Sequence, residues 1–403
     1  VDITMGMGVH YFGHSPEFIN DAVRKQIDRS SSVGPQADKA TEVARKICEM
    51  TGHDRAALFV TGSDAVMLAL RLVRAARRRN KVVIFGGAYH GICSDVLAAQ
   101  GEHGSIVMSP GIPPQVVEDI VVLDYDSPDS LARIKEMADE LAAVMVEPVQ
   151  SRNPALQPQR FLRQLRALCT ETGIPLVFDE MVNGFRQAPG GMQEWFGVKS
   201  DMSTFGKIIG GGYPLSVVSG NAELMQWIDG GQWQYGDDSA PLTDSISTGG
   251  THNKHPIALA AADAVLDHLN ANPGLAGEVR ARMHRLADRI NVYFENDAVP
   301  LRLTYCGTQF KFENFASGFE YELFFYLLTE RGIYSWELHV ANLSTEHTDE
   351  DCDALVSAIK SSIAEMRANG FDFRAANLRG QYFPMSSVQK RIYAVTQRKG
   401  AEK

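Results

Sequence analysis

Short apolar runs separated by helical patterns extend through much of the chain, and this alternation limits the possible folds more than any other feature. Four runs have the length of a strand and are apolar, apart from Lys81 at the start of one of them: 56–60, 81–85, 141–146 and 176–178. Unbroken apolar runs of that length are typical of strands that are buried on both faces. Helical patterns at 64–79 and 161–172 lie between them. The sequence therefore predicts an α/β fold with a mainly parallel sheet between helices.

We expect the chain to divide into a large and a small domain. An alanine-rich helical stretch over 251–270 is followed, after residue 302, by a smaller α+β pattern with a strand at 307–312 and a helix at 349–367. The last stretch differs in charge, because it carries six Lys or Arg residues and only one acid, Glu402. The expected parts are an N-terminal segment 1–40, a large domain 41–268, a small domain 269–376 and a separate piece 377–403.

Composition excludes several classes of protein. The chain has 403 residues with 39 Lys and Arg against 49 Asp and Glu, a net charge of −10, which argues against a nucleic-acid partner. No apolar stretch approaches the roughly 18 to 20 residues that span a bilayer. Five scattered cysteines without a CxxC pair predict neither a disulfide framework nor a metal site, and fit a cytoplasmic protein. The first residue is Val1 rather than Met, so we expect a piece of a longer protein.

The most informative residues are a carboxylate at a strand end and a lysine among glycines. Asp179 follows the run 176–178 and is expected at the carboxyl edge of the sheet, where ligands bind. Lys207 follows 207 − 179 = 28 residues later, next to Gly206. Glycines leave an amine uncrowded, and partial burial lowers a lysine pKa toward the nucleophilic form. Lys207 is thus a candidate to condense with an aldehyde, although a surface lysine in a flexible loop shows the same pattern.

Two other strand ends carry groups that can bind a ligand. Gly62 and Ser63 lie between a strand and a helix, where backbone N–H groups can hold a phosphate, but both are also ordinary turn and cap residues. Tyr89 and His90 follow the run 81–85 through glycines, so that an aromatic face can cover a planar ligand; an isolated histidine is more often structural. A phosphate site, an aromatic ring, a carboxylate and a lysine together are what pyridoxal 5′-phosphate (PLP) requires.

Seven short motifs carry a resemblance to a known family. They are Gly34-Pro35-Gln36, Thr61-Gly62-Ser63-Asp64-Ala65, Tyr89-His90-Gly91, Glu147-Pro148-Val149, the stretch from Phe178 to Arg186, the stretch from Gly206 to Gly212, and Gly249-Gly250-Thr251. Over about residues 2–366 the chain resembles the class III aminotransferases of PLP fold type I, and most of all the branch around glutamate-1-semialdehyde aminomutase. The resemblance implies a mainly parallel sheet of the seven-stranded type between helices, with a smaller α+β C-terminal domain.

The resemblance also implies catalytic roles. Lys207 resembles the lysine that binds PLP as a Schiff base and later moves a proton. Asp179 resembles the carboxylate that pairs with the pyridine nitrogen. Tyr89 resembles the residue stacked on the ring, with His90 beside it. Arg186 is a candidate for contact with the substrate, although it could equally be a core or surface residue.

Further residues are implied as cofactor contacts. Gly62 and Ser63 resemble the phosphate-binding cup, and Glu147 resembles the acid near the O3′ side of the cofactor. Thr251 resembles the threonine that reaches a phosphate across a dimer interface, which implies a homodimer with shared active sites. Met181 stands where the family often has a valine under the ring, so a longer side chain is expected there.

The last segment suggests which aminotransferase this is. Residues 381–393 resemble the opening of a condensation domain of a nonribosomal peptide synthetase, although a solvated amphipathic helix would look similar. We therefore expect the aminotransferase domain of a hybrid polyketide synthase and nonribosomal peptide synthetase, as found in antibiotic biosynthesis. Its partners would be adjacent synthase domains and an acyl carrier protein.

The implied reaction turns a carrier-bound β-keto acyl thioester into a β-amino acyl thioester, with an amino acid such as glutamate or glutamine as donor. The alternative is a glutamate-1-semialdehyde-type 2,1-aminomutase or another small-molecule class III aminotransferase. A PLP-fold scaffold without catalysis is disfavoured because Lys207 and Asp179 are both present. A dinucleotide enzyme is disfavoured because no GxGxxG stands between a strand and a helix.

Overall fold

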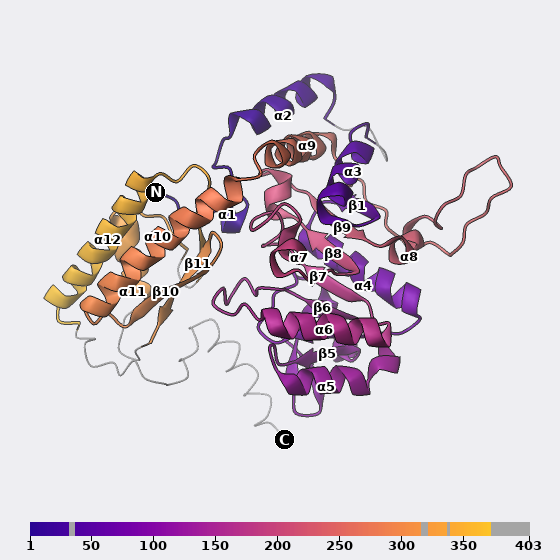
Figure 1. The fold of residues 1–403 in the computed structure, drawn as a ribbon, viewed down its shortest axis with the longest axis horizontal. Coiled ribbons are helices and arrows are strands. Elements are labelled where there is room, and N and C mark those ends of the chain that lie inside the picture. The colour runs from indigo at the N-terminus through magenta and orange to yellow at the C-terminus, as the bar shows by residue number, and fades with distance from the viewer. Residues whose placement is uncertain (32–36, 316–320, 337–338, 372–403) are drawn as a thin grey trace. The chain divides into compact units, whose positions relative to one another are not determined.

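The chain forms two compact units. The computed structural model describes residues 1–31, 37–315, 321–336 and 339–371. The larger unit is His14–Ala276, and the other combines Val1–Gly13 with the chain from Gly277 onward (Figure 1). The expected end of the large domain, residue 268, lies 276 − 268 = 8 residues before this boundary, while the expected segment 1–40 divides between the two units. The expected piece 377–403 lies outside the described residues.

A seven-stranded sheet forms the centre of the larger unit. Its strands, in spatial order, are β1 (Arg55–Phe59), β9 (Ser216–Gly220), β8 (Met202–Phe205), β7 (Leu176–Asp179), β6 (Leu141–Val146), β2 (Lys81–Phe85) and β5 (Ile120–Leu123). β9 runs antiparallel to both of its neighbours, and the remaining pairs are parallel. Every residue of β6 is buried, as expected for a strand covered on both faces. The predicted mainly parallel α/β sheet is confirmed.

Helices connect and cover these strands. In the larger unit they are α2 (Glu17–Arg29), α3 (Ala40–Thr51), α4 (Gly62–Arg77), α5 (Pro128–Glu136), α6 (Gln159–Thr172), α7 (Gly191–Phe196), α8 (Ala222–Met225) and α9 (Pro256–Ala271). Short 3-10 helices are η1 (Ser94–Val96), η2 (Pro114–Val117), η3 (Ala138–Glu140), η4 (Lys207–Gly210) and η5 (Gln226–Ile228), and β3 (Ala98–Gly101) pairs with β4 (Gly104–Val107). α4 packs against β6, β8 and β9 through its buried apolar face.

The smaller unit is built on a three-stranded antiparallel sheet. Its elements are α1 (Met5–Gly8), most of α10 (Leu275–Asn296), β10 (Leu301–Cys306), β11 (Gln309–Asn314), α11 (Tyr321–Glu330), β12 (Ala341–Asn342) and α12 (Asp349–Ala368). The first residues belong here because the amino group of Val1 donates to the carbonyl of Gly332 at 2.7 Å. Phenylalanines such as Phe294, Phe312 and Phe324 fill the core. No helix in the described part of the chain is long and apolar enough to cross a membrane.

Candidate active site

Asp179 ends β7 as a buried, fully hydrogen-bonded carboxylate. Its side chain accepts hydrogen bonds from Thr204 Oγ1 at 2.9 Å and from the backbone N–H of Met181 at 3.1 Å. Thr204 lies opposite Asp179 in the register of β7 and β8. Although burial alone would raise the pKa of Asp179, its hydrogen bond to His90 and the charge of that ring hold the pKa below its ordinary value. Asp179 is therefore an ionised carboxylate at the carboxyl edge of the sheet.

His90 is the residue that keeps Asp179 charged. Its Nδ1 lies 2.7 Å from Asp179 Oδ2, and both side chains are almost completely buried. Burial lowers the pKa of His90, but the charge and hydrogen bond of Asp179 outweigh this effect and raise the pKa above its ordinary value. His90 Nε2 is buried without a hydrogen-bond partner among the described residues. The sequence grouped His90 with the cofactor contacts, and the structure brings it against Asp179.

Lys207 begins η4 directly after β8 and Gly206. Its backbone has a positive φ of 47°, which turns the chain sharply at this point. Burial lowers the pKa of Lys207, although the nearby charges of Asp179 and Glu147 act in the opposite direction. A lowered pKa increases the fraction of neutral amine, which is the form that attacks a carbonyl group.

Glu147 follows β6, and its carboxylate joins the loop after β6 to the loop after β2 at the carboxyl edge of the sheet. Its Oε1 accepts from the backbone N–H of Ser151 at 2.7 Å, and its Oε2 accepts from that of Tyr89 at 3.3 Å. Burial and the charge of Asp179 raise the pKa of Glu147 above its ordinary value. Tyr89 itself keeps 43% of its surface exposed, so its ring is accessible beside this buried group.

At the start of α4, the side chains that cap the helix differ from the backbone groups that could bind a phosphate. Thr61 and Asp64 form a capping box, in which each side chain accepts from the backbone N–H of the other residue. The backbone N–H groups of Gly62 and Ser63 lie between these two, at the positive end of the helix. Ser63 Oγ accepts from the backbone N–H of Ile92 at 3.0 Å, which leaves its hydroxyl proton available to another acceptor.

Two glycines leave room for the side chain of Met181. A Cβ at Gly62 would lie 3.0 Å from Met181 Sδ, and a Cβ at Gly206 would collide with the same sulfur atom. Residues 62 and 206 come from different strand ends, so Met181 lies between the predicted phosphate site and the residue before Lys207. The sequence placed Met181 under the cofactor ring, and this role stays a prediction; the structure shows its side chain between these two glycines.

The residues of this cluster fit pyridoxal 5′-phosphate. The helix start at Gly62 and Ser63 offers donors to a phosphate, and Asp179 offers an ionised partner for a pyridine N–H. Lys207 offers an amine of lowered pKa. The described residues contain no group of three or more His, Cys, Asp and Glu that could hold a metal ion.

The remaining predicted positions relate to this cluster in different ways. Arg186 is completely buried, and its Nε donates to the carbonyl of Val182 at 3.2 Å; its charge contributes to the lowered pKa of Lys207. Thr251 is exposed shortly before α9. The motif at 34–36 lies outside the described residues. The roles of Arg186 and Thr251 therefore stay predictions.

The sequence did not single out Thr204, Gln150 or Arg152. Thr204 is an ordinary β-branched residue within a strand, and only the pairing of β7 with β8 brings it to Asp179. Gln150 Nε2 donates to the carbonyl of Gly86 at 2.8 Å, and the Arg152 guanidinium lies 5.0 Å from the centre of the Tyr89 ring. No local sequence pattern predicts contacts of this kind, because they join different loops.

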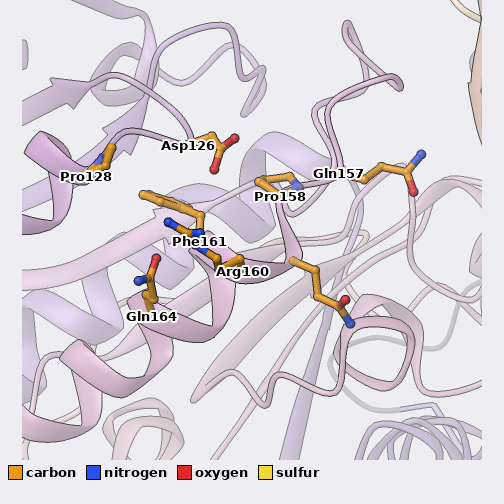
Figure 2. A pocket seen from close by; sticks show the side chains of 8 residues that line it. Asp126, Pro128, Gln157, Pro158, Arg160, Phe161 and Gln164 are labelled. Carbon is orange, nitrogen blue, oxygen red and sulfur yellow. The ribbon is translucent and has the colours of Figure 1, made fainter.

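A pocket lies at the end of β5 and the start of α6. It has a volume of about 450 Å³ (Figure 2), and it is lined by Asp126, Pro128, Gln157, Pro158, Gln159, Arg160, Phe161 and Gln164. Phe161 packs edge-on against Phe85, with 5.5 Å between ring centroids, and Phe85 ends the strand that leads to Tyr89. The pocket is thus separate from the cluster around Lys207 but opens at the same edge of the sheet.

Comparisons with known proteins agree with this site. The family model described as aminotransferase class-III matches residues 1–363. A glutamate-1-semialdehyde 2,1-aminomutase of Alkaliphilus oremlandii is 33% identical over 91% of this chain and 87% of its own length. One of Nitratidesulfovibrio vulgaris is 32% identical over 89% and 86%.

Solved structures of transaminases share the fold. An omega-transaminase from Sphaerobacter thermophilus superposes with a TM-score of 0.81 at 26% identity, covering 91% of this chain and 87% of that one. A beta-phenylalanine aminotransferase from Variovorax paradoxus gives 0.79 at 29% identity, covering 91% and 83%. Members of the class III family use PLP and are typically dimers. The match over most of its length and the cluster around Lys207 identify this chain as a class III aminotransferase, a PLP-dependent transaminase of fold type I.

Proposed function

We propose that this enzyme aminates a β-keto acyl thioester carried by an acyl carrier protein, with an amino acid such as glutamate or glutamine as donor. The observation that carries the choice of substrate is the stretch 381–393, whose resemblance to a condensation domain suggests a neighbour in a synthase assembly line. That stretch lies outside the described residues. An amine made at the β position could then be acylated by such a neighbour.

The residues of the site suit amino transfer. When bound, PLP supplies an electron-withdrawing ring that accepts the electron pair left by a proton removed at the substrate carbon. Asp179, held ionised by His90, would favour a proton on the pyridine nitrogen. Lys207 Nζ would anchor the cofactor and, when neutral, would take the proton from the donor Cα and deliver it to the C4′ carbon of the cofactor. Gly62 and Ser63 would hold the phosphate, and Glu147 would lie near the cofactor oxygen.

The exposed arginines of α6 support an acidic partner. Arg160 and Arg163 are both exposed, and neither forms an ion pair with an acid in the described part of the chain. Arg160 also lines the pocket at the start of α6. A local positive surface on a protein of net charge −10 favours docking of an acidic carrier protein at that edge.

We also assign Thr251 to the active site of a partner subunit. Its exposure on the segment before α9 leaves it accessible to a second copy, and dimers are typical of the family. Each active site would then contain the cluster around Lys207 from one subunit and Thr251 from the other.

A second candidate is an aminomutase that moves an amino group within one small substrate. It is favoured by the names of the curated relatives, which are glutamate-1-semialdehyde 2,1-aminomutases matching 86–87% of their own length. The two candidates differ in their products. A transferase given donor alone releases the keto acid, whereas a mutase converts its substrate without releasing one.

Mass spectrometry of the carrier protein tests the proposal. The enzyme with PLP is incubated with a β-keto acyl carrier protein and each candidate donor. We expect the acyl group to lose one oxygen and gain one nitrogen and three hydrogens with a preferred donor. If every donor leaves the carrier unchanged while glutamate-1-semialdehyde is isomerised, the aminomutase candidate replaces this proposal.

A further inference from the structure

Two loops at the carboxyl edge of the sheet are joined by buried polar contacts. Gln150, after β6, donates from Nε2 to the carbonyl of Gly86 at 2.8 Å, and a Cβ at Gly87 would lie 2.7 Å from its Oε1. Glu147 accepts from the backbone N–H groups of Ser151 and Tyr89 and so joins the same two loops a second time. Each loop therefore fixes the position of the other.

This arrangement places an arginine on the aromatic ring of the site. Arg152 follows Ser151 directly, and its guanidinium lies 5.0 Å from the centroid of the Tyr89 ring. Arg152 is exposed and Tyr89 is 43% exposed, so both can be reached from solvent. A guanidinium that lies over an aromatic ring loses little freedom on binding an anion, and its fork matches a carboxylate.

The other candidate arginine is less suited to this role. Arg186 is completely buried, and its Nε is engaged with the carbonyl of Val182. It therefore contributes its charge to the interior near Lys207. Arg152, in contrast, is exposed to solvent.

An accessible cation near Lys207 would favour the binding of an amino-acid donor. Every amino-acid donor carries a carboxylate, and the charges of Glu147 and Asp179 both act on Lys207. A negatively charged donor that approaches Lys207 is repelled by these acids. The buried charges of His90 and Arg186 offset part of this repulsion, and an exposed cation offsets more of it and can also contact the donor. Arg152 is exposed at the same loops and carries that charge.

We propose that Arg152 binds a carboxylate of the amino donor and thereby determines the preference for amino-acid donors over simple amines. The proposal rests on the transaminase activity alone and does not depend on the carrier-bound substrate. Arg152 is a specificity-determining residue in this account, since it touches the donor and not the bonds that change.

Binding of glutarate tests the proposal without turnover. Glutarate has two carboxylates and no amine, so calorimetric titration of the holoenzyme reports carboxylate recognition alone. We expect Arg152→Gln to weaken glutarate binding at least about tenfold, because a hydrogen-bonded charge pair is lost. Arg152→Lys should recover part of the affinity, since it retains the charge but not the fork. Arg24→Ala is the matched control, because it removes an exposed arginine of the same unit and should leave affinity unchanged.

Single-turnover reactions with two donors identify the carboxylate. If Arg152→Gln raises the apparent dissociation constants of alanine and glutamate alike, the bound group is the α-carboxylate; a rise for glutamate alone identifies the side-chain carboxylate. Either result supports the proposal if the maximal rate constants change little.

A change below twofold in the glutarate affinity and in both donor constants would overturn it, as would an equal loss in Arg24→Ala. The absorption spectrum of bound PLP and the thermal midpoint confirm that each variant is folded. If the wild-type enzyme converts no donor at all, the transaminase assignment fails, whereas glutarate binding still reports on Arg152.

Discussion

At the scale of single residues, the site depends on charges that are buried and compensated. Asp179 is 2% exposed, and a carboxylate at that depth is stable as an anion only if it is paired and hydrogen-bonded. His90, Thr204 and the backbone of Met181 supply these partners. The neighbouring acid has a different environment, because Glu180 is completely buried and accepts from the backbone N–H of Met192.

Glu180 predicts how stability depends on pH. Burial raises the pKa of Glu180 to about 8, from an ordinary value of 4.5. Between these values the folded state binds a proton that the unfolded state releases, so the free energy of unfolding falls as pH rises from about 5 to 8. Glu180→Gln removes this titration, and we expect its denaturation curves to vary less over that range than those of the wild type.

The control is Glu118→Gln, which alters an exposed acid. It should retain the pH dependence of the wild type. Identical pH dependence in Glu180→Gln and the wild type would show that Glu180 is ionised in the folded protein.

Gly206 predicts a steric coupling with Met181. Gly206→Ala would place a methyl group against Met181 Sδ, and overpacking of this kind costs about 1–3 kcal/mol. The shorter side chain in Met181→Val should restore much of the loss in the double variant. Gly249→Ala, where a Cβ meets nothing within 4 Å, is the control. Denaturant unfolding of the two single variants and the double variant measures the coupling energy, and additive losses would contradict the packing.

Only part of the residue-scale arrangement could be predicted from the sequence. Asp179 and Lys207 were identifiable because a strand end and a glycine-rich turn are local patterns. The partners of Asp179 were not, since His90 follows β2 and Thr204 lies in β8, and only the strand order brings these segments to β7.

At the scale of elements, the start of α4 links helix stability to the predicted phosphate site. The capping box of Thr61 and Asp64 fixes the first turn that presents the backbone of Gly62 and Ser63. The sequence expected this helix over 64–79, and the structure begins it at 62, because the cap residue is Thr61 rather than a residue closer to the apolar face.

Thr61→Ala is expected to affect stability and cofactor binding together. Loss of the cap should lower the free energy of unfolding by about 0.5–2 kcal/mol, and a frayed first turn should weaken PLP binding. Thr348→Ala is a matched control, because Thr348 and Asp351 form the same capping box at the start of α12 in the smaller unit. We expect a similar loss of stability there without loss of PLP affinity, as measured by titration of the apoenzyme. Equal PLP affinities in the two variants would contradict the prediction, because they would show that the cap at Thr61 does not support phosphate binding.

The strands were predictable for a physical reason. β2, β6 and β7 coincide closely with expected apolar runs, because a strand buried on both faces needs an apolar residue at every position. The reversed direction of β9 was not predictable, since the residues of a buried strand are equally apolar in either direction.

At the scale of the whole molecule, a protein of net charge −10 must still receive an acidic partner if the proposed function holds. Reversal of two charges in Arg160→Glu with Arg163→Glu should lower the association rate of the carrier protein at least about tenfold at low salt. The donor half of the reaction, measured with free glutamate, should be unchanged. Kinetics of carrier amination at increasing salt check the electrostatic origin, and equal rates for wild type and variant would remove α6 as the docking surface.

The expected boundary at residue 268 lies 276 − 268 = 8 residues before the end of the larger unit, and the expected segment 1–40 is divided between the two units. The change from an α/β to an α+β pattern indicated a boundary at 268, close to Ala276. That Val1–Gly13 belongs with the C-terminal unit had no sequence signal, because a short pairing such as that of Asp2 with Tyr334 joins segments far apart in the chain.

Among the residues of the site, Lys207 matters most, because it is the amine expected to bind the cofactor. The direct measurement is to treat the PLP-loaded protein with borohydride, digest it and locate the pyridoxyl group by peptide mass spectrometry. We predict that the group is found on Lys207 alone, and that Lys207→Ala retains no covalently attached pyridoxyl group. A pyridoxyl group on a different lysine, or none in a protein that binds PLP, would contradict the assignment of this active site.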